Sequence, residues 1–410
     1  MKQLWIIPFI LIVLLAACSG SDSNLPTATP EGVIAQFDSP SDAERVVATP
    51  RNVEAFEQWL SANQVITPEN VFQMTLIGRA DSPEPVSTIF SYAFSSDGTR
   101  LAALNNNYVL VWDLITGRLL VNNARREAIQ VFFSPDKMSV FTINPQGLIR
   151  IYGLERGREQ LNYDAHPNYS QRAAYNVEQG LLALGGTDGT IKVWDVFNRV
   201  SLVTIDAHDG AVVNLRFTPD MTYLVSAGED GEVIVWDWQN RERISTILPV
   251  ERVIHTAISP KNDQIAIATR DVVTVWTLPE GEFLYTLQVG EGGASSVLLF
   301  SPDGRYLING GVAMDMNVWT AASGDLVALL PGVIGTDVSA AFAPNSNLLL
   351  TAVLDGDVSL WNLDQIANQS LPRAALAPGG ERTLDVAWSP DGFLMLFIDA
   401  SGPVYVWGVE

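Results

Sequence analysis

The sequence predicts an all-β protein in which eight similar units, each about forty residues long, close into a ring. First, an aromatic residue ends a β-rich run at intervals of 40 to 46 residues, at Trp112, Tyr152, Trp194, Trp236, Trp276, Trp319, Trp361 and Trp407. Second, a turn sequence precedes most of these aromatics: FSSDG at 94–98, FSPDK at 133–137, FTPDM at 217–221, ISPKN at 258–262, FSPDG at 300–304, FAPNS at 342–346 and WSPDG at 388–392. Third, the intervening runs of Val, Ile, Leu, Phe and Tyr are short, and no segment sustains a helical period.

Each unit accommodates about four short strands, which are too few to bury both faces of their own sheet. Units stacked around an axis cover one another's faces, and closure of the ring removes the exposed ends. The third unit departs from the turn pattern, with YNVEQG at 175–180. Eight units of near-constant length therefore indicate one array that ends at residue 410.

The period, the SPDG-type turn, the Asp-Gly hairpin and the terminal VWD of these units resemble WD40 repeats. The resemblance covers about 340 of the 410 residues, from residue 71 to residue 410. It implies a WD40-type β-propeller with one blade per repeat and therefore eight blades. A seven-bladed ring that excludes one degenerate unit is the alternative.

The two ends of this region predict how the ring closes. The chain stops three residues after Trp407, so the last unit lacks an outer strand. FQMTLIG at 72–78 has strand character, and we expect it to pair beside VYVWG, as in WD40 propellers. Deleting residues 71–78 should then open the ring and unfold the domain.

The N-terminus has the proportions of a secretory signal over residues 1–17, with Lys2 before a short apolar run. Leu15-Ala16-Ala17-Cys18 resembles the lipobox of bacterial lipoproteins, which implies a lipidated Cys18 and an extracytoplasmic protein anchored to the cell membrane or outer membrane. An uncleaved anchor helix or a coincidental cysteine is the alternative. Residues 18–48 are expected to form a flexible tether, and residues 49–70 a short helical lead-in with a helix start at Ile66–Asn70.

Composition limits the partners and the chemistry. A net charge of −22 disfavours nucleic acid, and it leaves the lipid anchor as the expected membrane contact. The single cysteine excludes disulfides and, once lipidated, thiol catalysis. Three histidines and the absence of phosphate-loop, GxSxG and HExxH motifs predict no metal site and no cofactor. We expect His255 to be a satisfied or partly exposed strand residue and Trp238 to pack inside a blade. The carboxylates of the SPDG-type sequences are expected to form turns.

One set of side chains could nevertheless be mistaken for a hydrolase triad. His208, Ser226, Asp230 and Trp236 match the WD40 positions that form a hydrogen-bonded chain tying the strands of a blade together. The same spacing of 42 separates His166 from His208, Asp188 from Asp230 and Trp194 from Trp236. A catalytic triad has no reason to recur once per repeat, so we interpret the set as structural. The seventh unit keeps Thr351, Asp355 and Trp361 but has Val333 where the histidine would be. The remaining units lack the histidine, so we expect apolar packing and strand hydrogen bonds to hold most of the blades.

The resemblance also implies a function. WD40 propellers usually bind proteins or peptides on a loop-lined top face, so we expect a non-catalytic interaction scaffold or recognition module, monomeric as a domain. The residues expected on that face are Arg125, Arg126, Tyr169 and Asp209. The competing hypothesis is an extracytoplasmic enzyme or cofactor-binding propeller, quinone dehydrogenase-like or glycan-active. An assembly factor of the envelope would be a subclass of the binding hypothesis.

Overall fold

A computed structural model describes residues 62, 64–70, 73–81, 88–249, 251–287, 289, 295–311, 314–333, 338–354, 358–368, 373–376 and 382–409. The expected signal, Cys18, the tether and residues 49–61 of the expected lead-in lie outside the described residues. Among the described residues, no helix combines the length and apolar character needed to cross a membrane.

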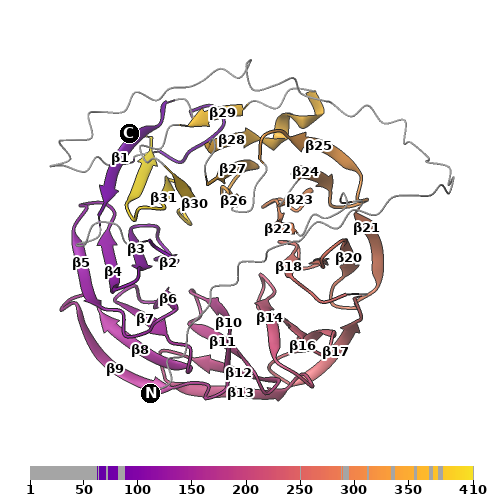
Figure 1. The fold of residues 1–410 in the computed structure, drawn as a ribbon, viewed down its shortest axis with the longest axis horizontal. Coiled ribbons are helices and arrows are strands. Elements are labelled where there is room, and N and C mark those ends of the chain that lie inside the picture. The colour runs from indigo at the N-terminus through magenta and orange to yellow at the C-terminus, as the bar shows by residue number, and fades with distance from the viewer. Residues whose placement is uncertain are drawn as a thin grey trace, which may run out of the picture. The chain divides into compact units, whose positions relative to one another are not determined.

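The described strands form eight four-stranded antiparallel sheets, which follow one another around a ring (Figure 1). This confirms the eight-bladed propeller over the seven-bladed alternative. Blade 1 consists of β2 (Ser91–Phe94), β3 (Arg100–Leu104), β4 (Tyr108–Asp113) and β5 (Leu119–Ala124). Blade 2 consists of β6 (Gln130–Phe133), β7 (Ser139–Ile143), β8 (Leu148–Gly153) and β9 (Arg158–Asp164). Blade 3 consists of β10 (Tyr169–Asn176), β11 (Leu181–Gly186), β12 (Thr190–Asp195) and β13 (Val200–Asp206). Blade 4 consists of β14 (Val212–Phe217), β15 (Leu224–Gly228), β16 (Val233–Asp237) and β17 (Glu242–Ile247).

The second half of the chain repeats this arrangement. Blade 5 consists of β18 (His255–Ile258), β19 (Gln264–Ala268), β20 (Val273–Thr277) and β21 (Phe283–Leu287). Blade 6 consists of β22 (Ser295–Phe300), β23 (Tyr306–Gly311), β24 (Met314–Thr320) and β25 (Leu326–Leu330). Blade 7 consists of β26 (Val338–Phe342), β27 (Leu348–Val353), β28 (Val358–Asn362), the 3-10 helix η4 (Leu363–Asn368) and β29 (Arg373–Leu376). Blade 8 consists of β30 (Thr383–Trp388), β31 (Leu394–Asp399), β32 (Val404–Gly408) and β1 (Thr75–Ala80).

Blade 8 is completed by the two ends of the repeat region. Strand β1 pairs antiparallel with β32, from Thr75 opposite Gly408 to Ala80 opposite Val404. Ile77 of β1 is 1% exposed and packs in one cluster with the inner strands of blades 8 and 1. The expected closing strand is confirmed, shifted by about three residues toward the C-terminus.

The residues just before β1 differ from the expected helix. Residues 66–70 form a turn, in which the Thr67 amide donates to the Asn70 side chain at 2.7 Å and the Asn70 side chain donates to the Val65 carbonyl at 2.9 Å. Ile66 is 2% exposed in the core shared by blades 7 and 8, and its amide donates to the Gly392 carbonyl. Ile66 is buried by packing against blades 7 and 8, so this segment does not need a helix to bury its apolar side chain.

The SPDG-type turns bind their own side chains. In five of the seven, a buried hydroxyl donates to the aspartate two residues later, as from Ser95 to Asp97 at 2.6 Å and from Ser301 to Asp303 at 2.7 Å. The same aspartate accepts backbone amides, which fixes the turn between the first and second strands. These carboxylates therefore form turns, as expected.

The recurring aromatics share one backbone feature. In blades 1 to 6 the pairing of the third and fourth strands shifts register at the aromatic, for example between Val235 and Trp236. A bulge increases the local twist and turns the side chain. Trp236 is 5% exposed and packs in a cluster shared by blades 3 and 4, so the aromatic helps join neighbouring blades.

Candidate functional site

The four residues that resemble a triad form a continuous chain inside blade 4. His208 Nδ1 lies 3.0 Å from Asp230 Oδ2, and His208 Nε2 lies 2.8 Å from Ser226 Oγ. The Trp236 indole donates to the same Ser226 oxygen at 2.9 Å. Ser226 is 1% exposed, so its hydroxyl is closed to a substrate. The arrangement ties the loop before β14 to β15 and β16.

Electrostatics agree with this structural role. Burial lowers the pKa of His208 and outweighs the attraction of Asp230, so the imidazole is neutral at neutral pH. Burial acts to raise the pKa of Asp230, but the amides of Glu232 and Asp209 and the contact with His208 lower it overall. A neutral imidazole that donates to a carboxylate and accepts from a hydroxyl completes the network.

Blade 3 keeps the histidine but not the chain. His166 is 1% exposed, its Nε2 lies 3.2 Å from Thr190 Oγ1, and its Nδ1 is buried with no hydrogen-bond partner among the described residues. The Trp194 indole donates to the Ala165 carbonyl at 3.1 Å, because the position of Ser226 is occupied in blade 3 by Leu184, next to Gly185, and offers no side-chain acceptor. Blade 4 therefore holds the more complete version of the motif.

A glycine of the preceding turn fixes each histidine loop. The Gly189 carbonyl accepts the amides of Ala207 and His208 at 3.1 Å. A Cβ on Gly189 would lie 1.8 Å from the His208 carbonyl oxygen, and its φ is +78°. Gly147 stands in the same relation to His166, at 2.0 Å with a φ of +77°. Only glycine fits this approach of two backbones.

Other blades anchor the aromatic with different side chains. The Trp319 indole donates to Asn309 Oδ1 at 2.6 Å, and the Trp361 indole donates to Thr351 Oγ1 at 2.9 Å. Each acceptor precedes its tryptophan by ten residues, as Ser226 precedes Trp236. Thr351 and Trp361 were expected as retained motif positions, whereas the Asn309–Trp319 pair of blade 6 was not predicted. A polar residue ten positions before the tryptophan was the available signal.

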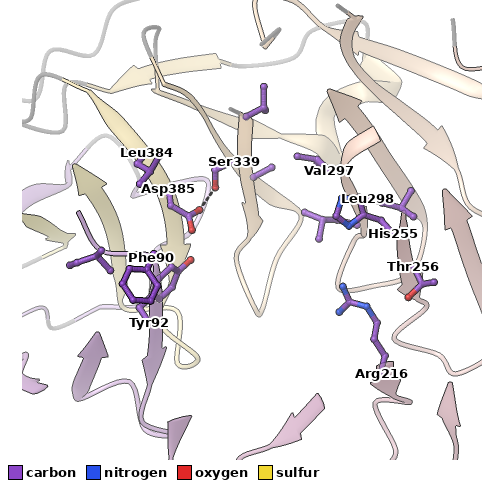
Figure 2. A pocket seen from close by; sticks show the side chains of 14 residues that line it. Phe90, Tyr92, Arg216, His255, Thr256, Val297, Leu298, Ser339, Leu384 and Asp385 are labelled. Atoms are coloured by element: carbon purple, nitrogen blue, oxygen red, sulfur yellow. Dashed lines mark hydrogen bonds between the residues drawn. The ribbon is translucent and has the colours of Figure 1, made fainter. Parts of the chain in front are cut away.

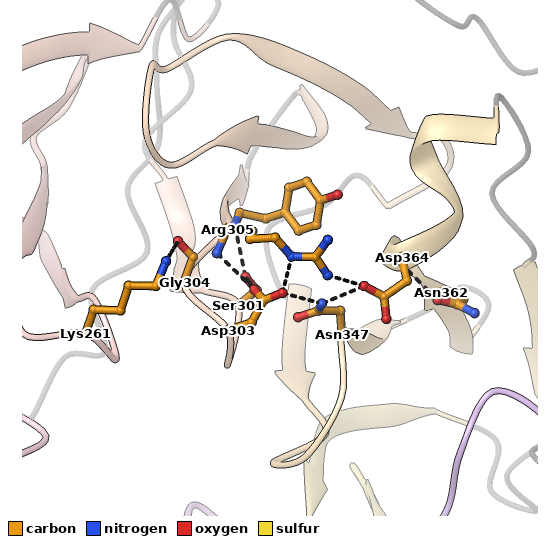
Figure 3. Close-up of polar contacts among 9 residues, drawn as sticks. Lys261, Ser301, Asp303, Gly304, Arg305, Asn347, Asn362 and Asp364 are labelled. Atoms are coloured by element: carbon orange, nitrogen blue, oxygen red, sulfur yellow. Dashed lines mark hydrogen bonds and ion pairs between the residues drawn. The ribbon is translucent and has the colours of Figure 1, made fainter.

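Two carboxylates meet between blades 6 and 7, where they could suggest acid–base chemistry (Figure 3). Asp303 and Asp364 both contact the Arg305 guanidinium. Asn347 Nδ2 donates to Asp303 Oδ2 at 2.7 Å and to Asp364 Oδ1 at 2.8 Å. Burial acts to raise the pKa of Asp303, but hydrogen bonds to Arg305, Ser301 and Asn347 hold it well below its usual range. The group stays ionised and ties the two blades together.

A central cavity of about 530 Å³ lies between the innermost strands (Figure 2). It is lined by Ile89, Phe90, Tyr92, Arg216, His255, Thr256, Val297, Leu298, Leu299, Val338, Ser339, Ala340, Leu384 and Asp385. His255 was expected as a satisfied or partly exposed strand residue, and it is half-buried in this wall. Arg216, Tyr92 and Asp385 line the same cavity, and no pattern in the sequence marks them as a group. Within the described ranges, no three His, Cys, Asp or Glu side chains gather as a metal-ligand set.

The residues expected on the top face have different surroundings. Asp209 is exposed, and its amide donates to Asp230 Oδ2 at 3.0 Å. Arg126 is exposed and pairs with Glu159 at 2.8 Å. The Arg125 guanidinium lies 5.1 Å from the ring centroid of Phe90, at the cavity wall. Tyr169 differs from the expectation: it is 5% exposed and donates to Gln130 Oε1, so its ring packs in the interior.

Trp238, which lies next to the repeat motif, was expected to pack inside a blade. It is 4% exposed, its indole donates to the Met221 carbonyl at 3.0 Å, and its ring meets Phe217 edge-on. The packing role is confirmed.

Comparison with known proteins adds the family of the repeats. The family described as "WD domain, G-beta repeat" matches residues 199–237 and 329–362. These two segments match the WD40 repeat. The first matched segment includes the hydrogen-bonded chain of blade 4, and the second includes the Thr351–Trp361 pair of blade 7.

Several known proteins are similar to this chain in sequence. Protein tipD of Dictyostelium discoideum is 25% identical over 67% of this chain and 47% of its own length. A periodic tryptophan protein 2 homolog of Neurospora crassa is 28% identical over 28% of this chain and 12% of its own length. An uncharacterized WD repeat-containing protein of Synechocystis is 31% identical over 26% of this chain and 30% of its own length. The chain thus spans less than half the length of each of these relatives.

A crystal structure of the computationally designed Ika8 protein resembles the WD40 propeller. Its TM-score is 0.65 at 20% identity, covering 80% of this chain and 98% of that chain. At that identity the likeness concerns the fold alone.

Proposed function

We propose that this propeller is a non-catalytic scaffold that binds a protein or peptide. The observation that carries the proposal is that the triad-like residues serve a structural role. Ser226 is buried away from any substrate, and its hydroxyl is hydrogen-bonded to both His208 and Trp236. The WD40 repeats support the same conclusion, because propellers of this kind generally bind protein partners.

The proposed binding surface is the top face, defined by the loops that enter each innermost strand and the turns between second and third strands. Asp209 and Arg126 lie exposed in two of these loops. Arg125 and the 44% exposed Phe90 extend the surface to the cavity wall. An aromatic ring beside a cation, next to exposed charges of both signs, suits a polar peptide with an apolar anchor.

Site-specific photo-crosslinking tests this surface. A photoreactive residue at position 126 or 209 should trap a partner in native membranes. The same residue at position 198, in the turn between β12 and β13 on the opposite face, is the matched control. Equal trapping from position 198, or none from 126 and 209, would contradict the proposed face.

We also propose that Cys18 carries a lipid that displays the propeller outside the cytoplasmic membrane. The Leu-Ala-Ala-Cys sequence after an apolar run supports this. Expression in a bacterium with labelled palmitate should label the wild-type chain and leave Cys18→Ala unlabelled. Equal labelling of both chains would refute lipidation at this residue.

A further inference from the structure

The central cavity is lined by groups that the strand pairing does not use. Its walls come from the innermost strands of blades 1, 4, 5, 6, 7 and 8 and from the segment before β2. Figure 2 shows Arg216, His255 and Thr256 on one side and Tyr92, Ser339 and Asp385 on the other. The cavity therefore has a cationic side and an acidic side.

Arg216 is the central group of the cationic side. It lies on β14, is solvent-accessible, and its guanidinium has no hydrogen-bond or ion-pair partner among the described residues. Protein nevertheless surrounds it closely enough that burial lowers its pKa. Arg126 and Arg305 each form an ion pair with a carboxylate, whereas Arg216 forms none within the described ranges. This is notable in a chain whose net charge is −22.

His255 also lines this side, and Arg172, which is not among the lining residues, acts on it through its charge. Burial, followed by the charges of Arg216 and Arg172, lowers the pKa of His255, so its imidazole is neutral at neutral pH. Arg172 follows a register shift in β10, and its Nε donates to the Val213 carbonyl at 2.8 Å. The guanidinium donors of Arg216 and the imidazole of His255 line the same cavity and can meet one oxyanion group.

On the acidic side, the Asp385 carboxylate already accepts hydrogen bonds from the protein. Asp385 accepts from the Ser339 hydroxyl and from the Val386 amide at 2.8 Å. Burial, followed by the charge of Asp385 and a hydrogen bond to it, raises the pKa of Tyr92, so the phenol remains protonated. Between the two sides lie apolar groups, among them Val297, Leu298 and Val338.

We propose that this cavity binds a carboxylate attached to an apolar body, with the carboxylate on Arg216. A planar guanidinium pairs with a carboxylate through two parallel hydrogen bonds. The apolar walls accept the body of the ligand, and the Asp385 side chain on the opposite wall disfavours a multiply charged anion such as phosphate or sulfate. The carboxylate can belong to a free small acid or to the C-terminal residue of a peptide. The site does not depend on the proposed scaffold function, because a free acid would fill it without a protein partner.

Calorimetry on the full chain, purified in detergent, tests the site with defined probes. 4-Methylvalerate should bind, whereas its neutral amide and sulfate should not. Arg216→Gln should weaken the affinity for 4-methylvalerate by about tenfold or more, and Arg216→Lys should weaken this affinity less. Arg118→Gln is the matched control, because it removes an exposed arginine from an outer turn of blade 1 and should leave affinity unchanged.

A hexapeptide ending in leucine, with a free or an amidated C-terminus, distinguishes the sources. If both 4-methylvalerate and the free-terminus peptide bind, the site accepts a carboxylate from a small acid or from a peptide C-terminus. If only one of them binds, the site accepts the carboxylate from that source alone. Failure of both probes, equal affinity for Arg216→Gln and wild type, or tighter binding of sulfate would overturn the proposal. A second readout is the His255 imidazole resonance, whose pKa should rise when a carboxylate offsets the charges of Arg216 and Arg172.

Discussion

Replacing Asp230 with alanine should destabilise the propeller through its most complete polar network. The carboxylate accepts from His208 Nδ1 and from the amides of Asp209 and Glu232. The His208 side chain is 0% exposed, so its lost partner cannot be replaced by bulk water. Asp209 is exposed and Glu232 is partly exposed, so the two amides can be hydrated.

The size of the effect follows from these contacts. Leaving the buried imidazole donor unpaired costs about 1–3 kcal/mol, and each hydrated amide adds about 0.5 kcal/mol, giving about 2–4 kcal/mol. The unfolding entropy of about 340 residues amounts to about 0.7 kcal/mol per degree, so the melting temperature should fall by about 3–6 °C.

Thermal unfolding followed by circular dichroism measures this shift, and Asp188→Ala is the matched control in blade 3. The Asp188 carboxylate binds Thr190 and Asn168 near the surface and has no direct hydrogen bond to His166. Its loss should therefore cost less than about 1.5 kcal/mol. An Asp230→Ala shift no larger than that of Asp188→Ala would refute the argument that the buried imidazole depends on its carboxylate.

Three further outcomes are expected. Gly189→Ala should lower the free energy of unfolding by several kcal/mol, because the added Cβ meets the His208 carbonyl. Gly231→Ala has open space at its Cβ and should show only the strain of its positive φ, so comparable losses for the two variants in chemical denaturation would contradict this. Burial lowers the folded-state pKa of all three histidines, so the unfolded chain binds protons before the folded chain as the pH falls. The melting temperature should therefore fall as the pH drops below about 6.5. A melting temperature that stays constant between about pH 7 and pH 5 would contradict this prediction. Deleting Thr75–Ala80 should abolish the single cooperative transition, and its survival would show that β1 is dispensable.

Much of the fold could be predicted because its signals are local and repeated. The spacing of the tryptophans and the Ser–Asp turns are set within one unit, so eight blades follow from the sequence. The closing strand was predictable because Ile77 and its neighbours form a β-rich run before the first full unit. Tyr169 was not, since its burial depends on how blade 3 packs against blade 2.

The cavity illustrates what the sequence does not carry. Arg216, His255 and Asp385 belong to different blades, and their approach depends on how many blades surround the axis. Bulges in the innermost strands add a second effect, because a register shift such as that between Thr383 and Asp385 re-aims the side chains that follow. Neither effect has a signature within a single repeat.

Closure by β1 has a consequence for the order of folding. Seven sheets consist of strands consecutive in the chain, whereas the eighth requires Thr75–Ala80 to meet Val404–Gly408. Translation from the N-terminus makes β1 first and its partner last, so the nascent propeller carries an unpaired strand through nearly the whole of its synthesis. Such long-range pairing is slow because the loop it closes is long. A circular permutant in which β1 directly follows β32 turns that pairing into a local hairpin and should close faster.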